Sequence, residues 1–249
     1  MVVRIVREYP ALFIPKKKIL TIADLHLGIE HELYKSGILI PPQAEKFKKI
    51  IDFLIKITRA KTLVILGDIK HKVPGISFRE MREIPKLFSY LVKKIRVICV
   101  KGNHDDNIES LLPKDVEIYS SRGFSIDKYG FFHGHALPSK GLMKCNFLFT
   151  AHIHPLIEFK DSFGYRIVEQ VWIKTKINEN IAKEKYKIKK IGKLEVIIFP
   201  SFNKLVGGLI LNKLEKSELA KPLISKNFIN LKNSMLYLVD GTFLGNLKI

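Results

Sequence analysis

Short runs of apolar residues, each followed by polar residues, recur along the first 151 positions of the chain. Most of them are four or five residues long and rich in β-branched or aromatic side chains. This length and composition are typical of buried β-strands. The runs cover residues 19–23, 62–66, 97–100, 131–132 and 147–151. They predict five buried strands.

A helical pattern fills two intervals between these strands. In residues 43–58, the apolar positions 47, 50, 51, 54, 55 and 57 form one stripe of a helix. Ser77 is a candidate N-cap for a second helix, which we expect to run to about residue 94 with a kink or break at Pro85. Residues 29–39 show no clear pattern. Strands that alternate with helices indicate an α/β fold.

Short strands are expected in most of the remaining chain. A hairpin around Pro10 opens the sequence, and Gly130 is expected to allow a turn before the run at 131–132. Further strands are predicted at 2–6, 11–14, 116–119, 123–127, 196–199, 236–239 and 242–247, and a helix at 217–223. The sequence shows no internal repeat or linker, so we expect residues 1–249 to form a single domain.

Residues 164–199 resemble a meander of strands. Within it, residues 178–182 would form the turn of a hairpin with one lysine-rich face, to which Lys185, Lys187 and Lys189 would belong. Such a face either follows a polyanion or discourages edge-to-edge pairing of strands. The sequence leaves both interpretations open.

The overall composition is that of a soluble globular protein, with 47% hydrophobic and 27% charged residues. The sequence has no uninterrupted apolar run near 18 residues and no signal-peptide pattern at its start. Cys99 and Cys145 lie in or beside apolar runs, which favours buried, reduced thiols. We therefore expect a cytoplasmic protein without a membrane partner.

The formal charge of +19 favours polyanionic partners, above all nucleic acid. Only eight of the 43 basic residues are arginine. Since bidentate phosphate contacts favour arginine, a lysine-rich surface that serves solubility is the alternative.

Polar side chains able to bind a metal follow all five buried strands. These residues are Asp24, His26, Asp68, Asn103, His104, His133, His135, His152 and His154. A single histidine is usually structural, but the chain has only eight, and most of them follow these strands. Ligand sites of open α/β folds lie beyond the carboxyl ends of strands. A mixed set of carboxylate, imidazole and amide groups suits Mn²⁺, Fe²⁺ or Zn²⁺ better than Ca²⁺.

Charge balance suggests two cations. Asp24 and Asp68 together contribute two negative charges, and two divalent ions would leave the site with a net positive charge. Two ions about 3.5–4 Å apart can hold a phosphate oxygen and activate a water for in-line attack at phosphorus.

In order along the chain, these motifs resemble the calcineurin-like metallophosphoesterases. The motifs are Asp24-x-His26, Gly67-Asp68, Gly102-Asn103-His104-Asp105, His133-Gly134-His135 and His152-x-His154. The resemblance implies a four-layer sandwich, in which two mixed β-sheets are flanked by helices.

The resemblance also implies a role for each motif residue. One metal would take Asp24, His26 and His154. The other would take Asn103, His133 and His152, with Asp68 as the bridge; whether His133 or His135 is the ligand is left open. His104 would be the acid that protonates the leaving oxygen, or it would stabilise the transition state. Mn²⁺ is the expected metal, with Fe²⁺, Zn²⁺ and Ni²⁺ as alternatives.

Finer motifs are Asp24-Leu25-His26-Leu27-Gly28, Gly-Asp-x-x-His at residues 67–71, and Pro200-Ser201-Phe202 with Gly207-Gly208. They are similar to motifs of the SbcD-related and DNA-ligase-associated short phosphoesterases. This similarity implies that His71 assists at the scissile phosphate. Ile69, Lys70 and His71 stand where protein phosphatases carry a further Asp and an Arg, which counts against phosphoprotein substrates.

The sequence therefore predicts a metal-dependent phosphodiesterase, a nuclease or nucleotide phosphodiesterase related to DNA repair, with DNA or a nucleotide as its phosphodiester substrate. The alternatives are a small-molecule phosphomonoesterase, a cyclic-nucleotide phosphodiesterase, or a nucleic-acid-binding scaffold with a structural metal site. A homodimer is compatible with the sequence, which does not fix the oligomeric state.

Overall fold

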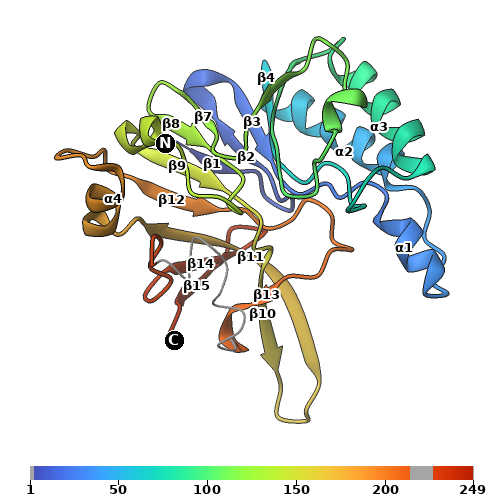
Figure 1. Ribbon diagram of the computed structural model, residues 1–249. Helices are drawn as coiled ribbons and strands as arrows, with labels where there is room; N and C mark the ends of the chain where they lie inside the picture. Colours follow the sequence, from blue (N-terminus) through green and yellow to red (C-terminus); the bar gives the residue numbers. More distant parts are fainter. Residues whose placement is uncertain (1–2, 214–226, 249) are drawn as a thin grey trace.

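Two mixed β-sheets pack face to face, with helices on their outer sides (Figure 1). The computed structural model describes residues 3–213 and 227–248. The α-helices in this part of the chain are α1 (Ile29–Lys35), α2 (Gln43–Thr58), α3 (Phe78–Leu91) and α4 (Glu179–Tyr186). This arrangement confirms the predicted α/β fold with two mixed sheets and flanking helices.

The first sheet has the strand order β1-β2-β3-β4-β5-β6. Its strands are β1 (Arg4–Ile5), β2 (Leu12–Ile14), β3 (Ile19–Ile22), β4 (Thr62–Leu66), β5 (Arg96–Val100) and β6 (Glu117–Tyr119). The strands β3 to β6 run parallel, whereas β1 and β2 form the expected antiparallel hairpin at its edge. Because β3, β4 and β5 are parallel, their carboxyl ends meet at one edge of the sheet.

The second sheet has the main order β13-β10-β11-β12-β9-β8-β7, with β14 beside β11 and β15 beside β14. The strands of its central part are β7 (Phe124–Ile126), β8 (Tyr129–Phe131), β9 (Phe147–Thr150) and β12 (Glu195–Ile198). The others are β10 (Pro155–Lys160), β11 (Arg166–Lys176), β13 (Leu209–Ile210), β14 (Met235–Leu238) and β15 (Phe243–Asn246). The strands β8, β9 and β12 are parallel, so their carboxyl ends also share an edge.

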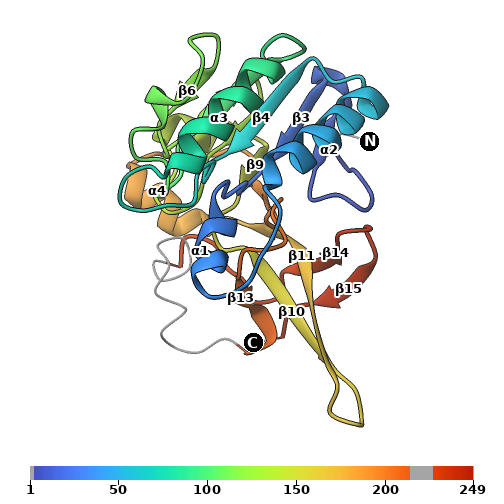
Figure 2. The same ribbon diagram turned by 90° about the vertical axis from the view of Figure 1, so that its right-hand side faces the viewer.

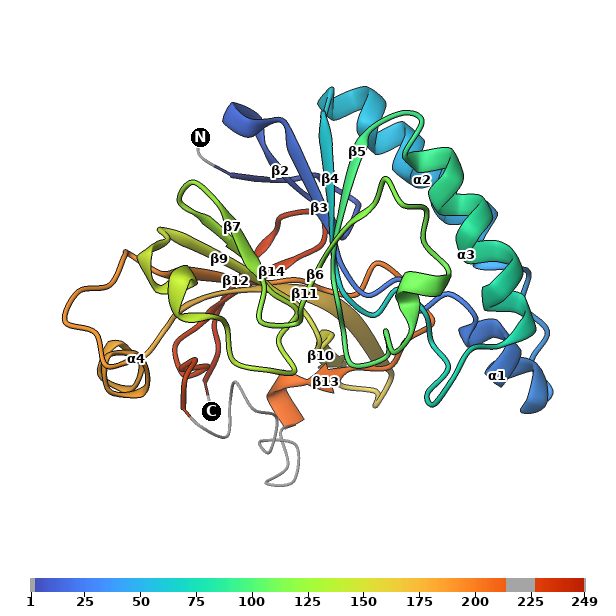
Figure 3. The same cartoon turned by 45° about the horizontal axis from the view of Figure 1, so that its top comes forward.

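Among the described residues, three hydrophobic clusters hold the layers together. Val64 and Ile98 of the first sheet pack with Phe131 and Phe149 of the second. The opposite face of the first sheet is covered by α2 and α3, as Figures 2 and 3 show. Burying a side chain of the size of Leu or Phe stabilises the fold by about 1.5–3 kcal/mol. The helices are therefore fixed to the sheet mainly by these contacts.

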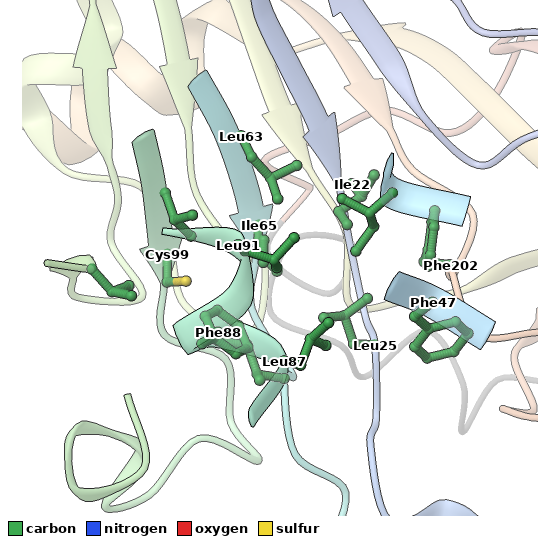
Figure 4. Packing of buried hydrophobic residues seen from close by; sticks show 14 of the residues in the cluster. Ile22, Leu25, Phe47, Leu63, Ile65, Leu87, Phe88, Leu91, Cys99 and Phe202 are labelled. Atoms are coloured by element: carbon green, nitrogen blue, oxygen red, sulfur yellow. The ribbon is translucent and has the colours of Figure 1, made fainter. Parts of the chain in front are cut away.

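Figure 4 shows the contact between the first sheet and its helices. Leu63 and Ile65 of β4 point toward Leu87, Phe88 and Leu91 of α3. The helix α2 begins and ends where its apolar stripe predicts. On the other side of the molecule, the second sheet packs against a cluster that includes residues of α4.

The helix α3 begins at a complete capping box. The Ser77 hydroxyl accepts a hydrogen bond from the Glu80 amide, and the Glu80 carboxylate accepts one from the Ser77 amide. The helix continues through Pro85 to Leu91, so the break considered at Pro85 was wrong, and the helix ends before residue 94. Buried residues on both sides of the proline, among them Ile84 and Leu87, fix both halves to the sheet.

Two other local predictions were wrong. Residues 178–189 form no hairpin: Asn178 caps α4 by accepting a hydrogen bond from the Ile181 amide, and Lys185 lies within that helix. The predicted strand face with three lysines therefore does not exist. Gly130 lies inside β8 and makes no turn; a Cβ atom there would lie 2.6 Å from a methyl carbon of Leu148. The helix predicted at 217–223 falls outside the described residues.

The hairpin of β10 and β11 projects from the body of the protein, as Figures 1 and 2 show. Phe163, in the loop that joins these strands, is 96% exposed. Among the helices of residues 3–213 and 227–248, none has the length and apolar character needed to cross a membrane.

Candidate metal centre

The polar residues that follow five strands come together in space. Because β3, β4 and β5 are parallel, and β8 and β9 are parallel, the loops after them start from the same edges of the two sheets. Their nitrogen and oxygen atoms form three overlapping groups, in each of which all ligand atoms lie within 4.8 Å of one another. The groups are Asp24, His26, Asp68 and His154; Asp68, His133 and His152; and His26, His71 and His104.

The first group contains buried polar atoms without a hydrogen bond. They are Oδ1 of Asp24, Nε2 of His26 and Nε2 of His154. His154 Nε2 lies 3.4 Å from Asp24 Oδ2, and His26 Nε2 lies 3.5 Å from Asp68 Oδ2. A buried polar atom without a partner costs about 1–3 kcal/mol. Three such atoms around one point fit a cation that they would share.

The second group shares Asp68 with the first. His133 Nε2 is 3.4 Å from Asp68 Oδ2 and 3.3 Å from Asn103 Oδ1. His152 completes the group, and its amide donates a hydrogen bond of 3.3 Å to Asp24 Oδ2. The structure thus brings together all seven residues predicted as ligands. Asp68 belongs to both the first and the second group.

His133 and His135 differ clearly in position. His133 is fully buried and contacts Asp68, whereas none of the three groups found in the described part of the chain includes His135. The ring of His135 lies next to that of His133, with 5.2 Å between the centroids. Of the two candidates, the geometry therefore favours His133 as the ligand.

Hydrogen bonds to carbonyl groups orient two of these imidazoles. Nδ1–H of His133 donates to the Leu66 carbonyl at 2.8 Å, and Nδ1–H of His154 donates to the Gly207 carbonyl at 2.9 Å. A carbonyl oxygen can only accept, so both rings carry a proton on Nδ1, and Nε2 is the nitrogen that faces the site. Metal-binding histidines are commonly oriented in this way.

The backbone at the site is strained. Asp24, His26, Asp68, His152 and His154 all have positive φ angles, between 40° and 73°. The left-handed conformation costs a residue with a side chain about 1–2 kcal/mol. Concentrated strain of this kind is typical of functional sites, because the surrounding fold must hold it in place.

Two glycines allow the loops to approach each other. A Cβ atom on Gly102 would lie 2.0 Å from Asp68 Oδ1, and one on Gly67 would lie 2.3 Å from His133 Nδ1. Even alanine at either position would push a candidate ligand out of place. The glycines of Gly67-Asp68 and Gly102-Asn103 are therefore part of the geometry of the site.

The charged groups of the site shift one another's pKa values. Burial alone would raise the pKa of Asp68, but His133 and His26 hold that pKa well below its usual range. Burial alone would lower the pKa of His133, but the carboxylates of Asp68 and Asp24 raise it to about 9. A divalent cation bound beside these carboxylates would displace the proton from His133, because a ligating imidazole must be neutral.

The two histidines predicted to be catalytic lie beside the first group. The His104 amide donates a hydrogen bond of 2.9 Å to Asp68 Oδ1, and its Nδ1–H donates one of 2.6 Å to the His71 carbonyl. His71 Nδ1 lies 3.3 Å from His26 Nδ1, and its Nε2 lies 2.7 Å from a carboxylate oxygen of Glu32. With Nδ1 engaged, Nε2 is the nitrogen of His104 that remains for proton transfer.

The sequence interpretation missed the residues that hold these loops. Lys70 has no exposed surface and donates hydrogen bonds to the carbonyls of Lys72, at 2.6 Å, and Gly75, at 2.9 Å. The Glu80 carboxylate accepts hydrogen bonds from the amides of His71 and Lys72. The only signal of Glu80 in the sequence was its capping-box spacing from Ser77, which indicates the start of a helix and not a functional site.

Other supports come from distant segments. Asp105, fully buried, accepts hydrogen bonds from the amides of Ile69, Lys70 and Gly102. The Ser201 hydroxyl donates to the Asp24 carbonyl at 3.0 Å, and the Asn203 side-chain amide donates to the Leu25 carbonyl at 2.9 Å. These contacts explain how the segment after β12 contributes to the site.

The residues present fit divalent metal binding. The donors are two carboxylates, several imidazoles and one amide, a set that first-row divalent metals accept. The unpartnered buried atoms of Asp24, His26 and His154 need a partner that a cation would supply.

A family model and solved structures are similar to this chain. The family model for calcineurin-like phosphoesterases (Metallophos) matches residues 17–200. The solved structure of nuclease MPE from Pseudomonas putida is similar, with a TM-score of 0.58 and 18% identity over 94% of this chain and 92% of that one. The structure of YfcE, a phosphoesterase from E. coli, has a TM-score of 0.38 and 20% identity over 58% of this chain and 74% of that one. Among curated proteins, no sequence matches significantly.

The family model covers well over half of the chain and includes every motif that follows β3, β4, β5, β8 and β9. The ordered motifs, the two facing sheets and the cluster of ligand atoms all agree with it. This chain belongs to the calcineurin-like phosphoesterase family, and it is a metal-dependent phosphoesterase.

Proposed function

We propose that this protein is a phosphodiesterase with two metal ions that cleaves DNA or a nucleotide. The observation that carries the proposal is the position of Asp68, whose carboxylate belongs to two ligand groups at once. A shared carboxylate is the simplest way to hold two cations a few ångströms apart. Paired cations are typical of enzymes that displace an oxygen at phosphorus.

We assign Asp24, His26 and His154 to one ion and Asn103, His133 and His152 to the other, with Asp68 between them. Mn²⁺ is the proposed metal, and Fe²⁺, Zn²⁺ and Ni²⁺ are the alternatives. When bound, such ions supply Lewis-acid polarisation of the phosphoryl group and a water of lowered pKa. The strained backbone and the Nδ1 hydrogen bonds support the assignment, because they hold the donor atoms in place before any ligand arrives.

His104 and His71 are the proposed catalytic residues. His104 is fixed at Nδ1 by the His71 carbonyl, so its Nε2 can hold a proton for the leaving oxygen or stabilise the charge that develops there. His71 lies beside His104, and its Nε2 contacts the Glu32 carboxylate, which fixes the ring where it can contact a phosphate. Neither residue belongs to the proposed metal ligands, which separates their role from metal retention.

DNA as the substrate is supported by the charge of +19. The nuclease from Pseudomonas putida also shares this fold. A role in DNA repair rests on the motifs shared with the SbcD-related and DNA-ligase-associated phosphoesterases. The alternatives are a small-molecule phosphomonoesterase, a cyclic-nucleotide phosphodiesterase and a nucleic-acid-binding scaffold.

The test is a substrate screen with added Mn²⁺. Methyl p-nitrophenyl phosphate, p-nitrophenyl phosphate, cyclic AMP and single- and double-stranded DNA should be compared at equal enzyme concentration. We expect hydrolysis of the diester and of DNA, loss of both in excess chelator, and recovery when Mn²⁺ is restored. Hydrolysis of the monoester alone would favour a phosphomonoesterase, and binding of DNA without any hydrolysis would favour the scaffold.

Two further expectations belong to this proposal. We propose that residues 1–249 form a single domain, which the hydrophobic cluster between the two sheets supports. We also propose a cytoplasmic location, in line with Cys99 and Cys145, which are both buried and free.

A further inference from the structure

A groove of about 1040 Å³ opens beside the proposed catalytic histidines. Its walls come from α1 and the start of α3, and His71 and His104 lie in its lining. These histidines form a tight group with His26, so one end of the groove lies next to the metal centre. A substrate held at the metal centre would therefore extend into the groove on the side of its leaving group, which His104 is proposed to protonate.

The groove carries an exposed aromatic ring. Phe78, the first residue of α3, is 90% exposed although it is a large apolar side chain. Its backbone is fixed, because Ser77 caps the helix and Glu80 completes the capping box. The ring thus stands on a rigid element with its surface uncovered. Such rings serve as stacking platforms for unpaired bases.

The charge of the groove is complementary to phosphate. Four basic residues line it, namely Lys35, Lys72, Arg79 and Arg82. Glu32 is the only acidic residue among its described lining residues, and it is engaged with His71. The side chain of Arg82 stays 62% exposed although it contacts Glu83 at 3.2 Å, and Arg79 contacts Glu30 only at 3.9 Å. The guanidinium groups therefore remain able to meet a phosphate backbone.

We propose that this groove binds the nucleotide on the leaving side of the scissile phosphodiester, with its unpaired base stacked on Phe78. The basic residues would meet the phosphates that follow. This inference rests on the proposed function and narrows its substrate class to nucleotidyl diesters with an unstacked base. A double helix fits less well, since its bases are already stacked on one another.

The test compares dinucleotides that differ only in one base. The substrates are thymidylyl-thymidine and two analogues, one without the leaving-side base and one without the other base. The Mn²⁺-loaded enzyme would hydrolyse each of them, and kcat/KM would be measured. In the natural enzyme, removing the leaving-side base should lower kcat/KM by about 5- to 150-fold, the range that base stacking on an aromatic ring gives. Removing the other base should have a smaller effect.

Phe78→Ala should abolish this discrimination, so that the dinucleotides with and without the leaving-side base react at similar rates. Phe78→Trp should preserve it, because the larger ring also stacks. Phe163→Ala is the matched control: this ring is 96% exposed, lies at the tip of the hairpin of β10 and β11, and should leave every ratio unchanged.

If Phe78→Ala discriminates as the natural enzyme does, the inference is wrong, and the exposed ring would then suit a protein partner. Methyl p-nitrophenyl phosphate separates this failure from that of the proposed function. If the natural enzyme hydrolyses this ester but its kcat/KM for the dinucleotides depends on neither base, only the groove inference is overturned. A chain that hydrolyses no diester overturns the proposed function and the inference together.

Discussion

Lys70 gives the sharpest test of how the catalytic loops are held. Its side chain has no exposed surface, and its ammonium group donates to the Lys72 and Gly75 carbonyls and to the Asp106 carboxylate. The other oxygen of Asp106 accepts a hydrogen bond of 3.1 Å from the Gly75 amide. We predict that Lys70→Met destabilises the protein and also lowers its turnover, because the loop that carries His71 loses its anchor.

The size of the effect follows from the three contacts. A hydrogen bond to a charged group contributes about 1.5–3 kcal/mol, and Lys70 makes two such bonds to carbonyl groups. The ion pair adds about 0–1 kcal/mol, since the Asp106 side chain is 40% exposed and water can solvate it. Methionine keeps the apolar stem and avoids the cost of burying an ammonium group. We therefore expect a net loss of about 2–4 kcal/mol in the free energy of unfolding.

Unfolding in urea and by heat measures this loss. For a chain of this length the expected fall in Tm is about 5–15 °C. Lys72→Met is the matched control, because Lys72 lies in the same loop with an exposed side chain. Its unfolding free energy should stay within about 0.5 kcal/mol of that of the natural protein. Equal stability of Lys70→Met and Lys72→Met would refute the reasoning.

The pH dependence supplies a second check. The hydrogen bond from Lys70 lowers the pKa of Asp106 below its ordinary value. A carboxyl group with a lowered pKa contributes its stability in full above its unfolded pKa, near 3.9, and loses it as the pH falls through the folded pKa. The difference between the natural protein and Lys70→Met should therefore be larger at pH 7 than at pH 3. A difference that does not change with pH would mean that Asp106 contributes nothing.

The remaining predictions concern the site and its surroundings. Asp68→Asn should lower metal content more than a change of any other single ligand, because its carboxylate would serve both ions; two retained equivalents in elemental analysis would contradict this. His104→Ala should keep its metals and lose about 10²- to 10⁴-fold in turnover, and less for a p-nitrophenolate leaving group, which needs little protonation. His71→Ala should likewise keep its metals but impair cleavage of DNA more than that of an activated small ester. Burial raises the pKa of Glu30, so its ionised form costs stability as the pH rises, and Glu30→Gln should raise Tm more at pH 8 than at pH 5.

The elements that the sequence predicted well are those in which a local pattern and the tertiary burial agree. Residues 62–66 and 43–58 have apolar patterns that only a buried strand and a helix on its face can satisfy, and both have the predicted bounds. The candidate ligands were found for a related reason. Strand ends are visible in the sequence, and parallel strands bring their ends together.

Other features depend on contacts that no local pattern reveals. Residues 185–189 alternate like a strand, but the cap at Asn178 and the burial of Ala182 and Tyr186 favour the helix α4. The supports of the site link residues far apart in the chain, as Asp105 does with Ile69. The choice of His133 over His135 likewise depends on which ring meets Asp68.

A metal titration tests the central claim most directly. Protein freed of metal by a chelator would receive Mn²⁺ in steps, and bound metal and hydrolysis of methyl p-nitrophenyl phosphate would be measured at each step. Two groups of ligands joined by Asp68 predict two bound equivalents per chain, with activity that reaches its maximum only when the second is filled. Full activity at one equivalent, or activity that survives excess chelator, would contradict the proposal of a dinuclear site.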